Sequence, residues 1–91
     1  RMNKIEKHKQ IAMELSSIYE KKNHDYGDSF AKTFQSLGII SAVTRITDKY
    51  NRLVSLATKK EQKVHDESMI DTLLDMANYC IMTVIELEEQ E

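Results

Sequence analysis

The chain has 91 residues, of which 31% are charged and 41% hydrophobic, and its formal net charge is −2. This length suits one small domain and is too short for two, so we expect residues 1–91 to form a single domain. The charge argues against a nucleic acid polymer or an anionic membrane surface as the partner. No apolar run is long enough to span a bilayer, which predicts a cytoplasmic protein.

The two ends and the single cysteine offer little chemistry. Arg1 precedes Met2, so we expect Met2 to be the natural start and Arg1 to be a remnant of expression. Residues 86–91 are acidic and are expected to fray into solvent. Cys80 lies among apolar residues and is expected to be a small buried side chain rather than a catalytic thiol.

The first predicted element is a helix over residues 3–22. The chain has no proline and only two glycines, which is unusual for a sheet protein of this size. Apolar residues instead recur at helical spacing in this segment. They are Ile5, Ile11, Ala12, Leu15, Ile18 and Tyr19.

A turn and a short helix are predicted next. Residues 24–29 are rich in turn formers, and Gly27 can adopt the left-handed conformation of a tight turn. Asp28 or Ser29 can cap the short apolar helix that follows. Gly38 is expected to end that helix.

Two long helices complete the predicted fold, over residues 40–59 and 66–89, with a charged loop at 59–65. Each has an apolar row expected to face the core. These rows are Ile39, Val43, Ile46, Tyr50, Leu53 and Ala57 in the first, and Ile70, Leu73, Leu74, Ala77, Ile81 and Val84 in the second. The sequence therefore predicts an all-α, small antiparallel bundle of three long helices and one short helix, which forms a homo-oligomer.

Acidic residues form a separate row on the last predicted helix. Glu67, Asp71 and Asp75 follow one another at intervals of four, and Asn78 continues the row. Like charges at this spacing repel, so a cationic group is expected opposite them. Carboxylate oxygens suit Mg²⁺ or Mn²⁺ bridging to a phosphate, which predicts a metal site. The alternative is that these acids only cap the helix or face solvent.

Basic residues form a matching row on the preceding helix. Arg45, Lys49 and Arg52 share one face with Asp48. Arginine pairs with carboxylate or phosphate through two parallel hydrogen bonds. These cations are therefore predicted either to bind the phosphates of a ligand or to form salt bridges with the acids of the last helix.

The predicted turn holds a third group of polar side chains. Lys22, Asp25 and Ser29 lie close in sequence to Tyr26, whose ring can stack on a base. The alternative is a solvated turn with Tyr26 packed at a helix end. No phosphate-binding glycine loop, zinc spacing or dinucleotide fingerprint is present.

Three separated segments resemble a known family. The strings KNHDYGDSF, SAVTRITDKYNRL and DESMIDTLLDMANYCIM are similar to the nucleotide-modification-associated domain, first type, a small helical family common in phages and prophages. The resemblance covers about residues 14–82 and implies a role in modified-nucleotide metabolism, in the host cytoplasm. The positions it marks are Lys22, Asp25, Tyr26, Gly27, Ser29, Arg45, Asp48, Lys49, Arg52, Asp66, Glu67, Asp71, Asp75, Asn78 and Tyr79.

A weaker resemblance links the last helix to MazG-like all-α nucleoside triphosphate pyrophosphohydrolases. Those enzymes hold Mg²⁺ with acids on facing helices, at Glu-x-x-Asp and Glu-x-x-Glu spacing. Here the acids of the last helix are spaced by four, and the first helix lacks the Glu-x-x-Glu pair.

Three functions follow as hypotheses. In the first, an enzyme cleaves a nucleotide: Glu67, Asp71 and Asp75 hold the metal, and Asp25 acts as the base. Lys22, Arg45, Lys49 and Arg52 then neutralise the phosphates. In the second, the same pocket, with Tyr26, Ser29 and Asn78, binds a nucleotide or a nucleotide-derived small molecule without cleaving it. In the third, the chain is a helical interaction protein whose polar rows form only salt bridges.

Overall fold

The computed structural model describes residues 2–58 and 62–90, with side chains over 2–58 and 67–90. Within these residues the chain is entirely helical, which confirms the predicted all-α class. The helices are α1 (Lys4–Tyr26), α2 (Ser29–Leu37), α3 (Ile39–Ala57) and α4 (Gln62–Glu89). The helix α4 begins earlier than predicted, and the rest of the predicted loop, residues 59–61, lies outside the described residues.

The helix α1 is longer than the sequence predicted. The Asn3 side chain accepts a hydrogen bond from the Glu6 amide at its start. The helix then continues through the segment predicted as a turn and stops only at Gly27, whose φ of 59° lies in the left-handed region. The prediction that residues 24–26 leave the helix was therefore wrong. One consequence is that Lys22 and Tyr26 lie one helical turn apart on the same face.

Two short breaks separate the first three helices. Asp28 also has a positive φ, of 56°, and occupies the capping position of α2, where its side chain makes no capping hydrogen bond. Aspartate tolerates this conformation better than most residues. Gly38, with a φ of 77°, ends α2 as predicted, and its amide donates to the Phe34 carbonyl oxygen at 2.7 Å.

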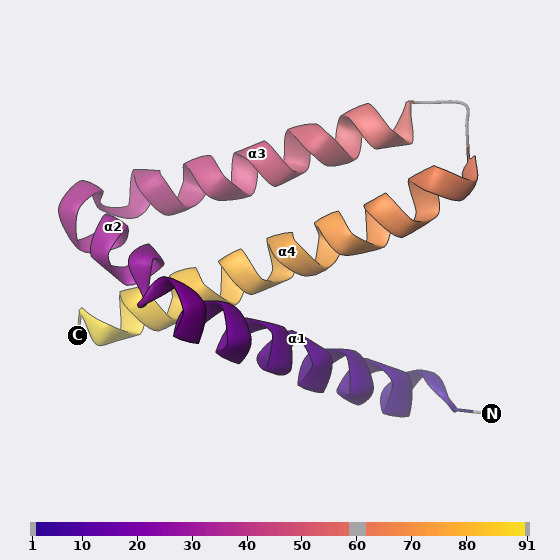
Figure 1. The fold of residues 1–91 in the computed structure, drawn as a ribbon, viewed down its shortest axis with the longest axis horizontal. Helices are drawn as coiled ribbons and strands as arrows, with labels where there is room; N and C mark the ends of the chain where they lie inside the picture. Colours follow the sequence, from indigo (N-terminus) through magenta and orange to yellow (C-terminus); the bar gives the residue numbers. More distant parts are fainter. Residues whose placement is uncertain (1, 59–61, 91) are drawn as a thin grey trace.

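The helices α3 and α4 form the main pair, packed side by side and antiparallel (Figure 1). The short helix α2 packs across one end of this pair, where Phe30, Phe34 and Ala42 form the buried core cluster. Tyr79 and Met82 of α4 pack against that cluster. The helix α1 contacts α4 near its own C-terminal end and diverges from it toward the N-terminus (Figure 1).

The rows predicted to face the core are largely exposed. On α3 the buried residues are Ala42 and Leu56 rather than the row that contains Val43 and Tyr50. Over residues 67–89 of α4 the buried residues are Thr72 and Thr83, and the predicted apolar row lies on the other side of the helix. Within a single chain, the prediction that these rows of α3 and α4 face the core was therefore wrong.

Three further predictions can be compared with the structure: those for Cys80, for the acidic end and for membrane spans. Cys80 is exposed, so the prediction that it is buried was wrong. Residues 86–89 of the acidic end belong to α4, and residues 1 and 91 lie outside the described residues. Over the described residues, no helix combines the length and the low polarity needed to cross a bilayer.

Candidate functional site

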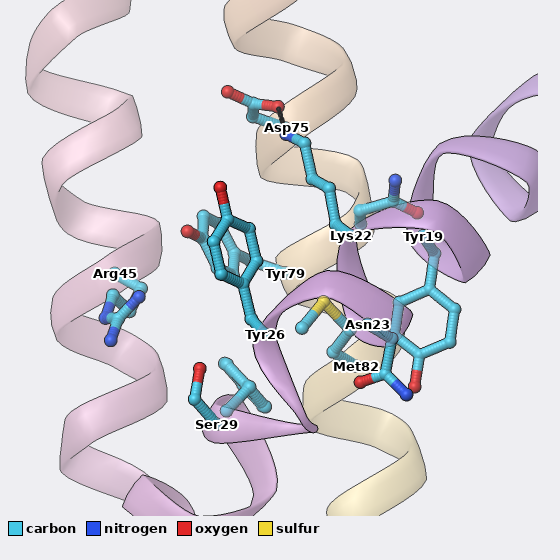
Figure 2. A pocket seen from close by; sticks show the side chains of 11 residues that line it. Tyr19, Lys22, Asn23, Tyr26, Ser29, Arg45, Asp75, Tyr79 and Met82 are labelled. Atoms are coloured by element: carbon cyan, nitrogen blue, oxygen red, sulfur yellow. Dashed lines mark hydrogen bonds and ion pairs between the residues drawn. The ribbon is translucent and has the colours of Figure 1, made fainter.

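A cavity of about 350 Å³ opens between the end of α1, the start of α2 and the facing sides of α3 and α4 (Figure 2). Binding sites for small molecules generally have volumes of about 300 to 1,000 Å³. The residues that line it are Tyr19, Lys22, Asn23, Tyr26, Ser29, Phe30, Arg45, Asp75, Asn78, Tyr79 and Met82. Six of the predicted site residues are therefore brought together: Lys22, Tyr26, Ser29, Arg45, Asp75 and Asn78.

Helical spacing explains why these side chains converge. Tyr19, Lys22 and Tyr26 follow at intervals of three and four on α1, and so share one face. On α4, Asp75, Tyr79 and Met82 follow at intervals of four and three. The Asn78 side-chain nitrogen donates to the Leu15 carbonyl oxygen at 3.1 Å, which ties α1 to α4 beside the cavity. Asn78 therefore has a positioning role in the structure in addition to lining the pocket.

Two lysines share one carboxylate at the cavity. The Lys22 ammonium lies 3.3 Å from Asp75 Oδ1, and the Lys49 ammonium lies 3.3 Å from Asp75 Oδ2 (Figure 2 draws the first pair). The three side chains, Lys22, Lys49 and Asp75, are 58%, 27% and 35% exposed. Ion pairs this open to water contribute about 0–1 kcal/mol each. Their weakness means that a ligand phosphate can replace Asp75 as the partner of either lysine at small cost.

Aromatic rings and an arginine complete the lining. The Tyr79 ring stacks on Phe30, with centroids 6.0 Å apart and planes inclined by 29°. The Arg45 guanidinium carbon lies 5.9 Å from the centre of the Tyr79 ring, within the range of a cation–π contact. Tyr26 projects from the last turn of α1 into the same space and is 69% exposed (Figure 2). The Tyr79 ring is therefore held in place by its neighbours, whereas the Tyr26 ring is exposed.

Two carboxylates outside the lining act on Tyr19, which lines the cavity. Burial raises the pKa of the Tyr19 phenol, and the charges of Asp28 and Glu86 raise it further. Burial likewise raises the pKa of the Glu86 carboxyl, with additional contributions from Asp28 and Glu89. Lys22 and Lys49 pair with Asp75, whereas Asp28 and Glu86 act on Tyr19, so the positive and negative side chains near the cavity gather around different lining residues.

The remaining predicted residues lie outside the cavity lining. Asp25, Glu67 and Asp71 are exposed. No group of three His, Cys, Asp or Glu side chains that could hold a metal ion occurs among the described residues. Lys49 reaches the site only through Asp75. The predicted set of three carboxylates is thus represented in the pocket by Asp75.

Arg52 was predicted to contact a ligand phosphate or an acid of the last helix, but it contacts a threonine hydroxyl. Its Nε donates to the Thr72 hydroxyl at 3.1 Å, and that buried hydroxyl donates to the Ser68 carbonyl oxygen at 2.7 Å. Among the described side chains, no salt bridge joins Arg45 or Arg52 to an acid of α4, so that alternative is not seen over residues 67–89 of the helix. Among side chains in residues 2–58 and 67–90, the recorded ion pairs join Asp75 to the two lysines.

Five lining residues were not among the predicted site residues: Tyr19, Asn23, Phe30, Tyr79 and Met82. Tyr19 belongs to the apolar row of the first predicted helix, and Phe30 belongs to the short apolar helix that follows the predicted turn. A helix continued past Lys22 would have indicated Tyr19, because it then shares a face with Lys22 and Tyr26. Tyr79 was marked by the family resemblance alone.

A family model described as nucleotide modification associated domain 1 matches residues 22–87. The chain belongs to this family. The match begins at Lys22, so Tyr19 is the lining residue that precedes it, and the rest of the cavity lining lies within the family domain. The resemblance to the nucleotide-modification-associated domain, first type, is thereby confirmed. No curated protein and no solved structure matches the chain.

Proposed function

We propose that this domain binds a nucleotide, or a small molecule derived from one, in the cavity between α1, α3 and α4. Lys22, Lys49 and Arg45 take the phosphates, and Tyr26 and Tyr79 take the base. The observation that carries the proposal is the meeting of these cations and rings around one cavity of about 350 Å³. The membership of the chain in a family named for nucleotide modification supports it.

The charge at the cavity supports an anionic ligand. Lys22 and Arg45 line the cavity, and Lys49 reaches it through Asp75, the carboxylate among the lining residues. This group of side chains is therefore positive within a chain whose net charge is −2. Clefts lined by one sign of charge attract ligands of the other sign. Arg45 adds a flat guanidinium, which can bind a phosphate through two hydrogen bonds.

The rings support a base rather than a bare phosphate. Stacking of a base on an aromatic side chain contributes about 1–3 kcal/mol. Phe30 behind Tyr79 fixes one ring, so it loses little side-chain entropy on binding. The exposed Tyr26 can move to cover the other face of the base.

The proposal is tested by thermal shift with nucleoside mono-, di- and triphosphates. A ligand at 100 times its Kd stabilises the fold by about 2.7 kcal/mol. Lys22→Gln should weaken binding about tenfold, since a charged hydrogen bond contributes about 1.5–3 kcal/mol. Lys21→Gln is the matched control, because Lys21 is an exposed neighbour on the same helix outside the cavity. No shift with any nucleotide, or equal losses in both variants, would refute the proposal.

A second candidate function is metal-dependent pyrophosphohydrolysis, in which Asp75 would hold Mg²⁺ or Mn²⁺ and the ion would polarise a phosphate. Asp75 at the cavity favours it. Asp25, Glu67 and Asp71 lie outside the lining, so we place binding first. Release of pyrophosphate from a triphosphate in the presence of Mg²⁺, abolished by Asp75→Asn, would support hydrolysis.

A further inference from the structure

Two apolar rows remain uncovered in this chain. On α3 the row is Ile39, Val43, Tyr50 and Val54, each 44 to 56% exposed. On α4 it is Ile70, Leu73, Ile81 and Val84, each 48 to 57% exposed. We call these two rows the outer face. Apart from Val54, these residues belong to the rows whose spacing predicts a core, yet the helices of the same chain leave them exposed to solvent.

Both rows lie on the side of the α3–α4 pair away from the nucleotide cavity. A helix turns about 100° per residue. On α3, the positions that face α4, such as Ala42 and Leu56, lie between Arg45 of the cavity and the exposed row. On α4, the buried Thr72 and Thr83 separate the cavity residues from the exposed row in the same way. The outer face is therefore one surface across two helices.

The chain exposes more surface than a compact monomer of its mass, and the excess is large enough for a dimer interface. A compact monomer of this mass exposes about 5,500 Å². This chain exposes 7368 Å². The excess of about 1,900 Å² is roughly twice the 800 Å² that each partner contributes to a standard interface. The radius of gyration, 14.9 Å, likewise exceeds the value of about 12 Å for a compact chain of this length.

The chemistry of the outer face points to a second copy of itself. Its two rows contain no charged residue, so they offer nothing to a phosphate backbone or to anionic lipid. A two-fold interface brings the same surface of both subunits together and must be self-complementary. The row on α4 meets this condition around Ala77. Ile70 and Val84 lie seven residues before and after it, and Leu73 and Ile81 lie four residues before and after it.

We propose that the outer face packs against the outer face of a second copy, with the two α4 helices antiparallel and crossing at Ala77. Ile70 then meets Val84 of the second copy, and Leu73 meets Ile81. The small Ala77 side chains allow the helices to approach closely. Both nucleotide cavities stay open on the outside of the dimer, so the interface does not depend on the proposed ligand.

Mass measurement is the first test. Light scattering after gel filtration of the whole chain at about 100 µM should give twice the 10.6 kDa chain mass. Leu73→Glu should raise the dimer Kd at least about 100-fold, because it buries two unpaired charges, and should give a monomer. Met13→Glu places the same charge on an exposed apolar position of α1 and should leave the dimer intact. A wild-type monomer, or a dimer unaffected by Leu73→Glu, would overturn the proposal.

Cross-linking tests the geometry without relying on a destabilised variant. In a Cys80→Ser background, Ala77→Cys should form a disulfide-linked dimer under mild oxidation. The natural Cys80 is the matched control. It lies three residues from Ala77, so an antiparallel crossing separates the two Cys80 backbones by about 9 Å along the helices, too far for a disulfide. Cross-linking through Cys80, or none through residue 77, would contradict this arrangement.

A nucleotide titration of Leu73→Glu separates this inference from the proposed function. We expect the variant to be monomeric and helical, with a nucleotide-induced thermal shift like that of the wild type. A dimer that binds no nucleotide would refute the proposed function alone. A monomeric wild type that binds nucleotide would refute this inference alone.

Discussion

Replacing Asp75 by asparagine distinguishes the two candidate functions by the sign of its effect. Asp75 lies 3.3 Å from each of two ammonium groups, Lys22 and Lys49. If those lysines bind the ligand phosphates, Asp75 competes with the ligand, and Asp75→Asn should tighten nucleotide binding. If Asp75 holds a metal that bridges to the phosphates, the same change should weaken binding in the presence of Mg²⁺.

The size of the gain follows from Coulomb's law. A phosphate oxygen in contact with Lys22 from the open side lies about 6 Å from the Asp75 carboxylate. Repulsion between unit charges at that distance is about 0.7 kcal/mol in water and about 2.8 kcal/mol at an effective dielectric constant of 20. Because Asp75 is 35% exposed, we expect about 1 kcal/mol, or roughly fivefold tighter binding. Losing two exposed ion pairs, each contributing about 0–1 kcal/mol, should lower the stability of the free protein by no more than about 2 kcal/mol.

Isothermal titration with a nucleoside diphosphate, with and without Mg²⁺, measures the effect. Asp71→Asn is the matched control, since Asp71 lies one turn away on α4 and outside the cavity lining. The gain for Asp75→Asn should shrink as salt is raised, because the Debye length falls from about 10 Å at 0.1 M to about 3 Å at 1 M. Unchanged or weaker binding by Asp75→Asn without Mg²⁺ would refute the assignment of Lys22 and Lys49 to the phosphates.

Three further predictions concern Tyr26 in the cavity, Phe34 in the core cluster and Glu86 on α4. Tyr26→Ala should weaken nucleotide binding by about 1–3 kcal/mol while leaving unfolding in urea nearly unchanged, since the ring is exposed in the free chain; equal affinities would place the base elsewhere. Phe34→Ala should destabilise the fold by about 3–5 kcal/mol in urea unfolding followed by circular dichroism, because Phe34 is 2% exposed in the core cluster; a loss below about 1 kcal/mol would contradict that packing. The raised pKa of Glu86 means that its charged form is disfavoured in the folded state. This lowers the stability of the fold above the folded-state pKa and has no effect below the ordinary value of 4.5. Glu86→Gln should therefore raise the melting temperature at pH 7 and leave it unchanged at pH 4, and a gain of equal size at both values would count against the electrostatic explanation.

The sequence predicted the helical class and most element boundaries because these depend on local signals. The absence of proline and the apolar periodicity indicated helices, and Gly38 marked the break between α2 and α3. The end of α1 was missed because Asn23, His24 and Asp25 have weak helix propensity and resemble a turn. Tertiary contacts through Leu15 and Asn78 hold α1 against α4 despite that preference.

The faces of the helices were harder to predict than the helices. Apolar spacing identifies a row that must be covered, but it does not say whether the cover comes from the same chain. The rows through Val43 on α3 and Ile81 on α4 were therefore assigned to the internal core, whereas the internal contacts are made by Ala42, Leu56 and Thr72. Lys22 of α1 and Lys49 of α3 share one aspartate, Asp75 of α4. Lys22 and Asp75 are 53 residues apart along the chain, so no local pattern reveals their pairing.

The loose attachment of α1 makes this helix a place where binding of the proposed ligand would be detected. The helix α1 supplies Lys22 and Tyr26, yet Leu15 is its buried residue, and its N-terminal half diverges from α4 (Figure 1). Backbone amides in that half should exchange with deuterium sooner than those of the α3–α4 pair, since fewer neighbours oppose local opening. A molecule that links Lys22 to α3 restrains the end of α1, so slower exchange there would register occupancy of the cavity.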